Sequence, residues 1–370
     1  MARVKLGDVA REYKSTVRDA EGLPSVGLEH LTPGEITLEQ WNENAENTFT
    51  KEFKKGQMLF GRRRAYQKKA ALAPFDGVCS GDITVIEAVP GKLLPELLPF
   101  VIQNDALFDY AVGQSAGSLS PRVKWESLKN YEFELPELKK QVAMAELLKA
   151  AYQTKIAYQK LIKATDDLVK SQFIEMFYEK GYPEYKLKEL CSKITDGTHK
   201  TPNYQDSGIT FISAKNIIDG KLSFDDVKYI TTEEYKEIQK RCMTEPGDVL
   251  MAKSGSLGMV AIVDTDQPLG LFESLAVLKY DRAKLDGIFL KEQLRSDTAQ
   301  RQLMAGVKGV AVKHLHLNVI SEVPVIVPPV DIQRQFATFV EQSDKSKFEL
   351  TQSIVRIDNM IKSLMQEHIL

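Results

Sequence analysis

The stretch DIQRQFATFVEQSDKSKFELTQSIVRIDNMIKSL, residues 331–364, constrains the architecture most strongly. Neither glycine nor proline occurs between residues 331 and 370. A recurring set of positions steps alternately by four and three residues: Phe336, Val340, Ser343, Lys347, Leu350, Ile354, Ile357, Ile361 and Leu364. An average step of about 3.5 residues is typical of a coiled-coil seam. At a rise of about 1.5 Å per residue, roughly 40 helical residues form a rod of about 60 Å.

A second stretch of the same kind covers residues 137–180, and Gly181 and Pro183 end it. Its seam positions are Leu147, Ala151, Thr154, Tyr158, Leu161, Thr165 and Leu168. Both helices are longer than a globular domain needs, which predicts that each packs on the other. The threonines weaken the first seam, so ordinary amphipathic surface helices remain the alternative.

The chain repeats itself once, with a period near 190 residues. The matching pairs keep their order: 5–9 (KLGDV) with 186–190 (KLKEL), 25–31 (SVGLEHL) with 211–217 (FISAKNI), 55–59 (KGQML) with 246–250 (PGDVL), 133–136 (FELP) with 325–328 (VIVP), and Gln141 with Gln333. A period this long indicates a duplicated domain rather than a solenoid. Chance agreement of short apolar runs is the alternative.

Each copy begins with a globular part that mixes strand and helix signals. Short apolar runs bounded by turn residues predict strands at 84–86, 209–212, 260–263 and 323–327, and residues 93–110 and 285–304 predict helices. The fold class is therefore α+β. The predicted division is a globular domain over 1–136, a helix over 137–182, a second domain over 183–330 and a helix over 331–370.

The composition excludes several classes of protein. The chain has 370 residues, with 49 Lys and Arg against 51 Asp and Glu, so net charge gives no argument for nucleic-acid binding. Three cysteines without a CxxC pair exclude a disulfide scaffold and argue against a cysteine zinc site. The start lacks the apolar core of a signal peptide, and no run reaches the roughly 20 apolar residues of a membrane span. These features predict a cytoplasmic protein without a membrane partner.

Motifs of common enzyme classes are missing from the sequence. There is no GxxxxGK[ST], no GxGxxG and no GxSxG. His314 and His316 alternate as on a strand, but no carboxylate or cysteine stands near them at ligand spacing. The sequence predicts neither a catalytic residue nor a metal site.

Charge is strongly segregated along the first copy. Residues 19–50 hold seven acids and no Lys or Arg, whereas residues 51–69 hold eight Lys or Arg and one acid. The predicted DNA-binding residues here are Lys54, Lys55, Arg62, Arg63, Arg64, Lys68 and Lys69. The arginines follow the apolar run 58–60, which places them in a loop beyond a strand, near Tyr66. Arginine can bind the edge of guanine with two parallel bonds, and lysine neutralises phosphates. A solvated charged loop is the alternative.

The second copy has other polar groups at the equivalent strand end. The candidates for DNA contact are Lys200, Lys215, Asn216, Lys253, Ser254, Ser256, Lys308, Lys313 and His314. Asn216 has the chemistry to read adenine, and a role in a turn is an equal alternative.

The second copy carries the runs DGTHKTP (196–202), GITFISAKNI (208–217), PGDVL (246–250) and VPPVDIQ (327–333). In this order, and with two similar domains each followed by a long helix, the chain resembles the specificity (S) subunits of type I restriction-modification enzymes. The first copy departs from the pattern, because it lacks DGTH and has LPELKKQ at 135–141.

The resemblance implies a non-catalytic subunit whose two target-recognition domains each read one half of a split DNA sequence. It implies that the helices pack as an antiparallel coiled coil that sets the half-site spacing. Methyltransferase subunits using S-adenosylmethionine, and motor-nuclease subunits using ATP and Mg²⁺, are the implied partners, with no cofactor in this chain. The helix positions predicted to bind partners are Leu147, Tyr158, Leu161, Leu168, Leu350, Ile354, Ile357 and Ile361.

Three alternatives stay open from the sequence. The chain could be the recognition subunit of a related enzyme that cuts on both sides of its target. It could be a coiled-coil scaffold that contacts no DNA. It could also be a self-contained nuclease or methyltransferase with an unrecognised site.

Overall fold

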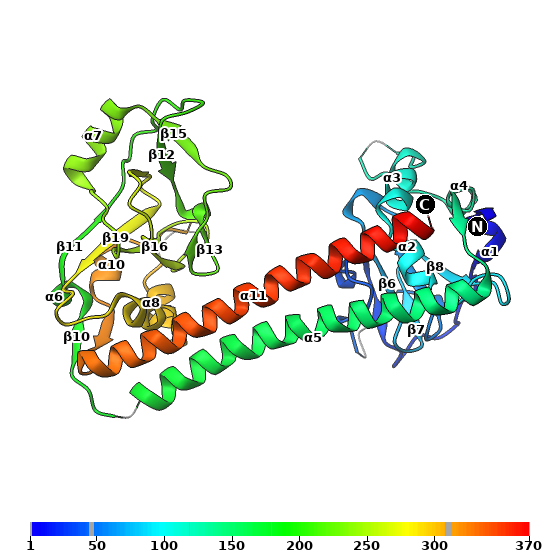
Figure 1. Ribbon diagram of the computed structural model, residues 1–370, viewed down its shortest axis with the longest axis horizontal. Coiled ribbons are helices and arrows are strands. Elements are labelled where there is room, and N and C mark those ends of the chain that lie inside the picture. The colour runs from blue at the N-terminus through cyan, green and yellow to red at the C-terminus, as the bar shows by residue number, and fades with distance from the viewer. Residues whose placement is uncertain (1, 44–47, 118, 179, 308–312, 370) are drawn as a thin grey trace. The chain divides into compact units, whose positions relative to one another are not determined.

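The computed structural model describes residues 2–43, 48–117, 119–178, 180–307 and 313–369. The chain divides into two compact units (Figure 1). The first unit contains the residues up to Lys160 together with those from Leu350 onward, and the second runs from Leu161 to Glu349. Each unit therefore combines one globular part with portions of both long helices. The predicted four-part division stays a prediction.

The first unit begins with strands and short helices and ends on a long helix. Its elements are β1 (Ala2–Lys5), α1 (Leu6–Val9), β2 (Ala10–Glu12), β3 (Ser25–Val26), η1 (Leu28–His30), β4 (Lys51–Phe53), β5 (Met58–Gly61), η2 (Ala65–Gln67), β6 (Ala70–Leu72), β7 (Gly77–Cys79), β8 (Ile83–Ala88), α2 (Leu98–Ile102), α3 (Asp105–Gly113), α4 (Trp125–Leu128), β9 (Glu132–Leu135) and the first part of α5 (Leu138–Phe177).

The second unit repeats this order with additions, and it lacks a counterpart of η2. Its elements are β10 (Glu184–Lys186), α6 (Leu187–Leu190), β11 (Cys191–Asp196), β12 (Ile209–Ile212), η3 (Ala214–Asn216), β13 (Ile217–Ile218), β14 (Lys221–Leu222), β15 (Lys228–Ile230), α7 (Thr232–Arg241), β16 (Val249–Ala252), β17 (Val260–Ile262), β18 (Leu269–Leu271), β19 (Leu275–Tyr280), α8 (Gly287–Arg295), α9 (Asp297–Ala305), α10 (Leu317–Ser321), β20 (Pro324–Ile326) and the first part of α11 (Val330–His368).

The four-stranded sheets of the two units correspond strand by strand, and each unit also has a three-stranded sheet with a different strand at its centre, β7 in the first and β12 in the second. An antiparallel sheet has the order β2-β8-β5-β6 in the first unit and β11-β19-β16-β17 in the second. A three-stranded sheet has the order β3-β7-β4 in one and β15-β12-β18 in the other, each with one parallel pair. The pairs β1–β9 and β10–β20 join the first and last strands of each globular part. This agreement confirms the predicted duplication and the α+β class.

The predicted helices 93–110 and 285–304 are each interrupted once. The Asn104 side chain accepts a bond from the Ala106 backbone N–H, and the Ser296 side chain accepts one from Ala299. Side-chain oxygens in this position start a new helix, so each predicted helix is two consecutive helices, α2–α3 and α8–α9.

The paired glutamines hold the long helices to their globular parts. Gln141 accepts from the Leu94 N–H at 2.9 Å and donates to the carbonyls of Pro136 and Lys92 at 2.9 and 3.1 Å. Gln333 makes the same three kinds of bond, with Asp286 N, Pro328 O and Lys284 O, at 2.8 to 2.9 Å. Both side chains are buried. The sequence match of Gln141 with Gln333 is thus a structural equivalence.

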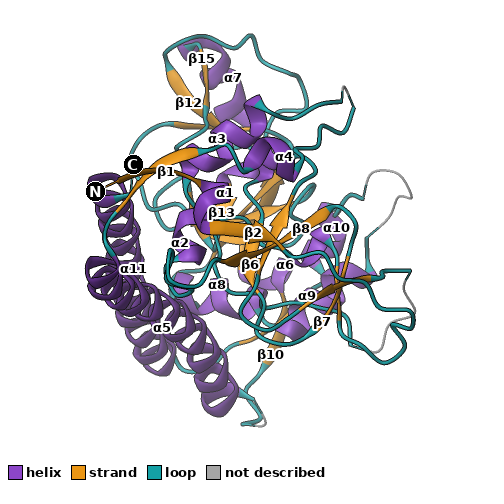
Figure 2. Cartoon of the chain, turned by 90° about the vertical axis from the view of Figure 1, so that its right-hand side faces the viewer, coloured by secondary structure: helices purple, strands orange, loops and turns teal. Residues whose placement is uncertain are grey.

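In each unit one long helix contacts the other through an ion pair. In the first unit, Lys155 Nζ of α5 lies 3.1 Å from Asp358 Oδ1 of α11, and the two segments lie side by side (Figure 2). In the second, Lys347 Nζ of α11 lies 2.7 Å from Asp166 Oδ1 of α5. Lys155 follows Gln141 by the same number of residues as Lys347 follows Gln333, so the two contacts are equivalent. Coiled-coil packing itself stays a prediction.

The predicted seam of α5 is wrong at its leucines. Leu147, Leu161 and Leu168 are about half exposed, and Tyr158 is half-buried. The buried stripe lies one position further along, where Leu148 packs into the core of the first unit and Val169 into that of the second. The globular cores thus determine which face of α5 is covered. On α11, Leu350, Ile354, Ile357 and Ile361 are half-buried, on the face that the sequence predicts.

Candidate nucleic-acid interface

The predicted basic loop of the first unit leaves the sheet where β5 ends at Gly61. The Arg62 backbone N–H donates to the Asp82 carbonyl at 2.9 Å, and the Gly61 N–H donates to the Lys69 carbonyl at 2.9 Å. These two bonds close a loop over residues 62–68, as the sequence predicts. We call residues 62–68 the basic loop.

The basic loop has an unusual backbone. Arg64 and Lys68 have φ of 55° and 52°, in the left-handed region that residues with a Cβ rarely adopt. The short helix η2 lies between them and carries Tyr66 on the surface. Strained non-glycine residues persist where the surrounding structure holds them, and they concentrate at functional sites. The backbone thus favours a functional loop over a merely solvated one.

Two arginines converge on one carboxylate at the base of this loop. Arg122 donates to Asp82 through Nε at 2.7 Å and Nη2 at 3.2 Å, and Arg63 Nη1 lies 3.5 Å from the same group. The bonds from Arg122 hold the pKa of Asp82 below its ordinary value, against the opposing effect of partial burial. The carboxylate is ionised at neutral pH, and with its two guanidinium groups it forms a cluster of net charge +1.

The remaining cations predicted in the first unit are held differently. Lys68 pairs with Asp105 at 2.6 Å, and Lys69 donates to the Leu28 carbonyl at 2.8 Å. Lys54 pairs with Glu52 and Asp76, and Lys55 is exposed. Lys54 and Lys55 precede β5 whereas the arginines follow it, and a four-residue strand separates them by about 13 Å. The structure therefore brings together Arg62–Arg64, Lys68 and Lys69, and leaves the other two lysines at the opposite end of the strand.

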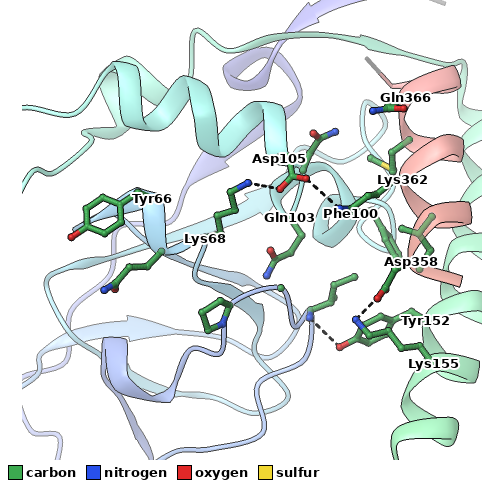
Figure 3. Close-up of a pocket in the computed structure, with 17 residues that line it drawn as sticks. Tyr66, Lys68, Phe100, Gln103, Asp105, Tyr152, Lys155, Asp358, Lys362 and Gln366 are labelled. Carbon is green, nitrogen blue, oxygen red and sulfur yellow. Dashed lines mark hydrogen bonds and ion pairs between the residues drawn. The ribbon is translucent and has the colours of Figure 1, made fainter. Parts of the chain in front are cut away.

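A cavity of about 570 Å³ adjoins the basic loop within the first unit (Figure 3). Tyr66 and Lys68 lie at one side, and Tyr152, Lys155, Asp358 and Lys362 of the long helices line the other. Asp105 forms ion pairs with Lys68 and Lys362, and Lys155 forms ion pairs with Glu35 and Asp358. Because its charged groups pair with one another, the cavity offers no unbalanced charge for an ionic ligand.

The second unit places a carboxylate cluster at the corresponding sheet edge, but buries it. Lys253, which follows β16 as Arg62 follows β5, is only 7% exposed and donates to Asp196. Arg241 donates to the same carboxylate, and His199 Nε2 lies 3.4 Å from it. Burial opposes ionisation of Asp196, but the bonds from Lys253 and Arg241 outweigh it and lower the pKa.

This burial corrects the prediction for Lys253. Its ammonium group donates to Asp196 and to the Glu273 carbonyl, the latter at 3.1 Å. Lys253 therefore holds together the segments at this edge, and its charge is not accessible to a ligand. Removal of either partner would leave the other charge buried and uncompensated, which destabilises a fold. Ser254 and Ser256, which follow it, are half-buried and exposed respectively.

Asn216 also has a structural role. Its Oδ1 accepts from the Ser213 N–H at 3.0 Å, and its Nδ2 donates to the carbonyls of Ser223 and Asp226, both at 3.1 Å. The side chain is buried and uses both ends of its amide within the fold. The turn interpretation is correct, and the prediction that Asn216 reads adenine is wrong.

The other candidates of the second unit are surface residues. Lys200 and Lys313 are exposed, His314 is half-buried, and Lys215 pairs with Asp226 at 2.7 Å. Lys308 lies outside the described residues. Among the described residues, no group of three or more His, Cys, Asp or Glu could hold a metal ion. Within the same residues, no helix is long and apolar enough to cross a membrane.

Comparison with known proteins identifies the repeated unit. A model of the family described as the type I restriction modification DNA specificity domain matches residues 2–165 and again residues 179–356. The chain belongs to this family. Each specificity domain match contains one globular part and most of the long helix that follows it. The resemblance that the sequence motifs indicate is thereby confirmed.

Two solved structures share the fold over nearly the whole chain. The type I restriction-modification S subunit from M. genitalium aligns with a TM-score of 0.58 at 14% identity, over 98% of this chain and 95% of that one. A chain from a study of complex assembly and conformational transition in the type I R-M system aligns with a TM-score of 0.59 at 17% identity, over 99% and 96%. At these identities the likeness shows the fold alone.

A curated relative is similar over a shorter region. The EcoBI specificity subunit of Escherichia coli is 25% identical over 162 residues, which are 43% of this chain and 34% of that protein. The chain thus spans about a third of the length of the curated relative it matches.

One arginine of the site in each specificity domain, Arg122 and Arg241, lies outside the residues that the sequence predicts. Val123 N–H donates to the Arg62 carbonyl at 2.9 Å, and Leu315 N–H donates to the Lys253 carbonyl at 2.8 Å. Arg122 is therefore the counterpart of His314, and an alignment of the copies carries that signal. Arg241 lies 45 residues from Asp196, and no local pattern predicts their contact.

Proposed function

We propose that this chain is the sequence-specific DNA-recognition subunit of a type I restriction-modification complex. Each specificity domain reads one half of a bipartite target, and the long helices set the distance between the halves. The observation that carries the proposal is the duplication: two matches to the specificity domain fall on two units that share the same four-stranded sheet.

The basic loop supports DNA as the ligand of the first domain. Arg62, Arg63 and Arg64 follow one another at the end of a buried strand, next to Tyr66. A rigid strand end that carries arginines can present bidentate donors at a fixed position, which base recognition requires. In the second domain, exposed Lys200, Lys313 and Ser256, together with Lys215, Ser254 and His314, are the proposed contacts.

The exposed face of α5 supports docking of modification subunits. Leu147, Leu161 and Leu168 are about half exposed, and seven-residue spacings put them on one face of the helix. Apolar positions that face away from both the globular core and α11 are suited to a partner helix. Motor-nuclease subunits would join the same assembly.

The chain itself would catalyse nothing in this assembly. Methyl transfer to adenine would use S-adenosylmethionine on the modification subunits, and restriction would use ATP and Mg²⁺ on the motor-nuclease subunits. The methyltransferase would rotate the adenine out of the stack, because its target atom is inaccessible within a duplex.

The test is reconstitution of the chain with its modification subunits. Sequencing of DNA methylated by this complex should reveal one bipartite sequence, and a footprint should protect both halves. A single contiguous site, or no sequence preference, would overturn the proposal. The isolated chain should bind DNA weakly, with affinity falling steeply as salt rises.

A further inference from the structure

A second loop is fastened onto the basic loop in the first specificity domain. The backbones of Ala116 and Arg122 exchange two hydrogen bonds, at 3.0 and 2.9 Å, and so close this second loop. The Arg64 N–H donates to the Pro121 carbonyl at 2.8 Å. Backbone hydrogen bonds therefore join the basic loop to the segment that carries Arg122.

Leu119 of the second loop faces solvent, and two arginines close to this loop are partly exposed. Leu119 is 91% exposed, although leucine side chains are ordinarily covered. The side chains of Arg63 and Arg122, next to it, are 37% and 42% exposed. A duplex that approaches the basic loop can therefore reach both guanidinium groups.

The contact with Asp82 fixes the orientation of Arg122. The carboxylate occupies the edge of the guanidinium formed by Nε and Nη2, at 2.7 and 3.2 Å. The outer end of the group keeps further N–H donors, which form the fork that a guanine edge or a phosphate accepts. Arg63 is held by the same carboxylate and by Ser120 Oγ, which accepts from Nη2 at 3.0 Å.

The charge balance distinguishes a base contact from a phosphate contact. A phosphate clamp depends on net positive charge, and a carboxylate beside the arginine reduces that charge. A base contact depends instead on donors held at fixed angles, and the same carboxylate provides this. The pair of Asp82 with Arg122 lowers electrostatic affinity and improves geometry, which suits reading of sequence.

We infer that Arg122 contacts a guanine edge in one half of the DNA target, and that Asp82 is the positioning residue for Arg122 and Arg63. The inference rests on the proposed function, because it names the group that reads the half-site of the first domain. It adds one reading side chain to the basic loop and explains why an acid lies at its base.

The experiment compares Arg122→Lys and Asp82→Asn in the complex with modification subunits. The duplexes are unmethylated. They carry either the sequence that the wild-type complex methylates or the same sequence with a single base-pair change in one of its halves. Lys129→Gln is the control, because Lys129 is an equally exposed cation of the same domain that pairs with Glu126. Thermal unfolding of each variant shows whether its fold is intact.

Arg122→Lys keeps the charge but lacks the fork, so methylation of the target should fall about tenfold or more. Discrimination should relax at one guanine position in one half only, and Asp82→Asn should relax it at the same position. Lys129→Gln should behave as wild type.

Two results would overturn the inference: unchanged discrimination in Arg122→Lys, or an equal loss on every duplex whatever its sequence. Arg122→Lys decides the question even where Asp82→Asn fails to fold. If the wild-type complex itself shows no bipartite preference, the proposed function is wrong. If it does and the Arg122 variant matches it, only this inference is wrong.

Discussion

The first and second specificity domains place an acid at the same edge of the same sheet, with opposite consequences. Asp82 is 20% exposed and holds two arginines that reach solvent. Asp196 is buried and neutralises Lys253, with Arg241 bonded to it from outside the strand. The same scaffold can therefore expose a cation to solvent at the end of an inner strand, or bury it in an ion pair that holds the fold together. Under the proposed function, this freedom would let two copies of a fold read different sequences.

The largest expected effect is on the stability of the buried cluster. Lys253→Met removes the main partner of Asp196, and breaking a buried pair typically costs about 3–5 kcal/mol. Arg241 remains bonded, so we expect about 3 kcal/mol, measured as a loss of unfolding free energy in urea. Arg62→Met is the matched control at the equivalent position, and it should cost less than about 1 kcal/mol. Equal losses in the two variants would contradict the contrast between the domains.

Because the first domain exposes its cations, we expect their removal to have a large effect on DNA binding. Replacement of Arg62, Arg63 and Arg64 by Gln removes three guanidinium groups, each worth about 1–3 kcal/mol where it makes a bidentate contact with a base. We expect binding by the complex to fall about a hundredfold or more, with lost preference in one half of the target only. Competition binding with half-substituted duplexes measures this. Equal loss of preference in both halves would show that the basic loop is a general phosphate clamp.

The two acids should also differ in how they shape the dependence of stability on pH. Both have lowered pKa values, Asp82 through Arg122, and Asp196 through Lys253 and Arg241 acting against burial. Their stabilisation is complete above the unfolded pKa near 3.9 and is lost as pH falls through the folded value. Asp196→Asn should reduce the acid slope of the unfolding free energy more than Asp82→Asn. Urea unfolding between pH 3 and 5 measures it, and identical slopes in the two variants would contradict the difference in burial.

The smallest effect is expected at the opposite end of β5. Lys54 pairs with Glu52 and Asp76, and Lys55 is exposed about 13 Å from the basic loop. The double replacement by Gln should weaken binding by the complex about twofold and leave the methylated sequence unchanged. A loss comparable with that of the arginine variant would extend the interface to this end of the strand.

Much of the architecture follows from local patterns. The match of Gln141 with Gln333 and the glycine and proline positions revealed the duplication, and the alternation along residues 331–364 revealed the covered face of α11. The same reasoning failed on α5. Its leucines form the cleaner stripe, but the globular cores cover the neighbouring face because Leu148 and Val169 pack into them.

The sequence by itself determined the duplicated α+β domain, the two long helices and the basic loop, because each depends on periodicity or on residues close together in the chain. Only the tertiary structure decided which cations reach solvent. Lys253 and Asp196 stand 57 residues apart, and Arg122 and Asp82 stand 40 apart. Strand pairing brings them together, and no local pattern records it. Lys253, which the sequence predicts as a DNA contact, is therefore buried in an ion pair with Asp196. Arg122, which lies outside the basic run, becomes part of the proposed interface.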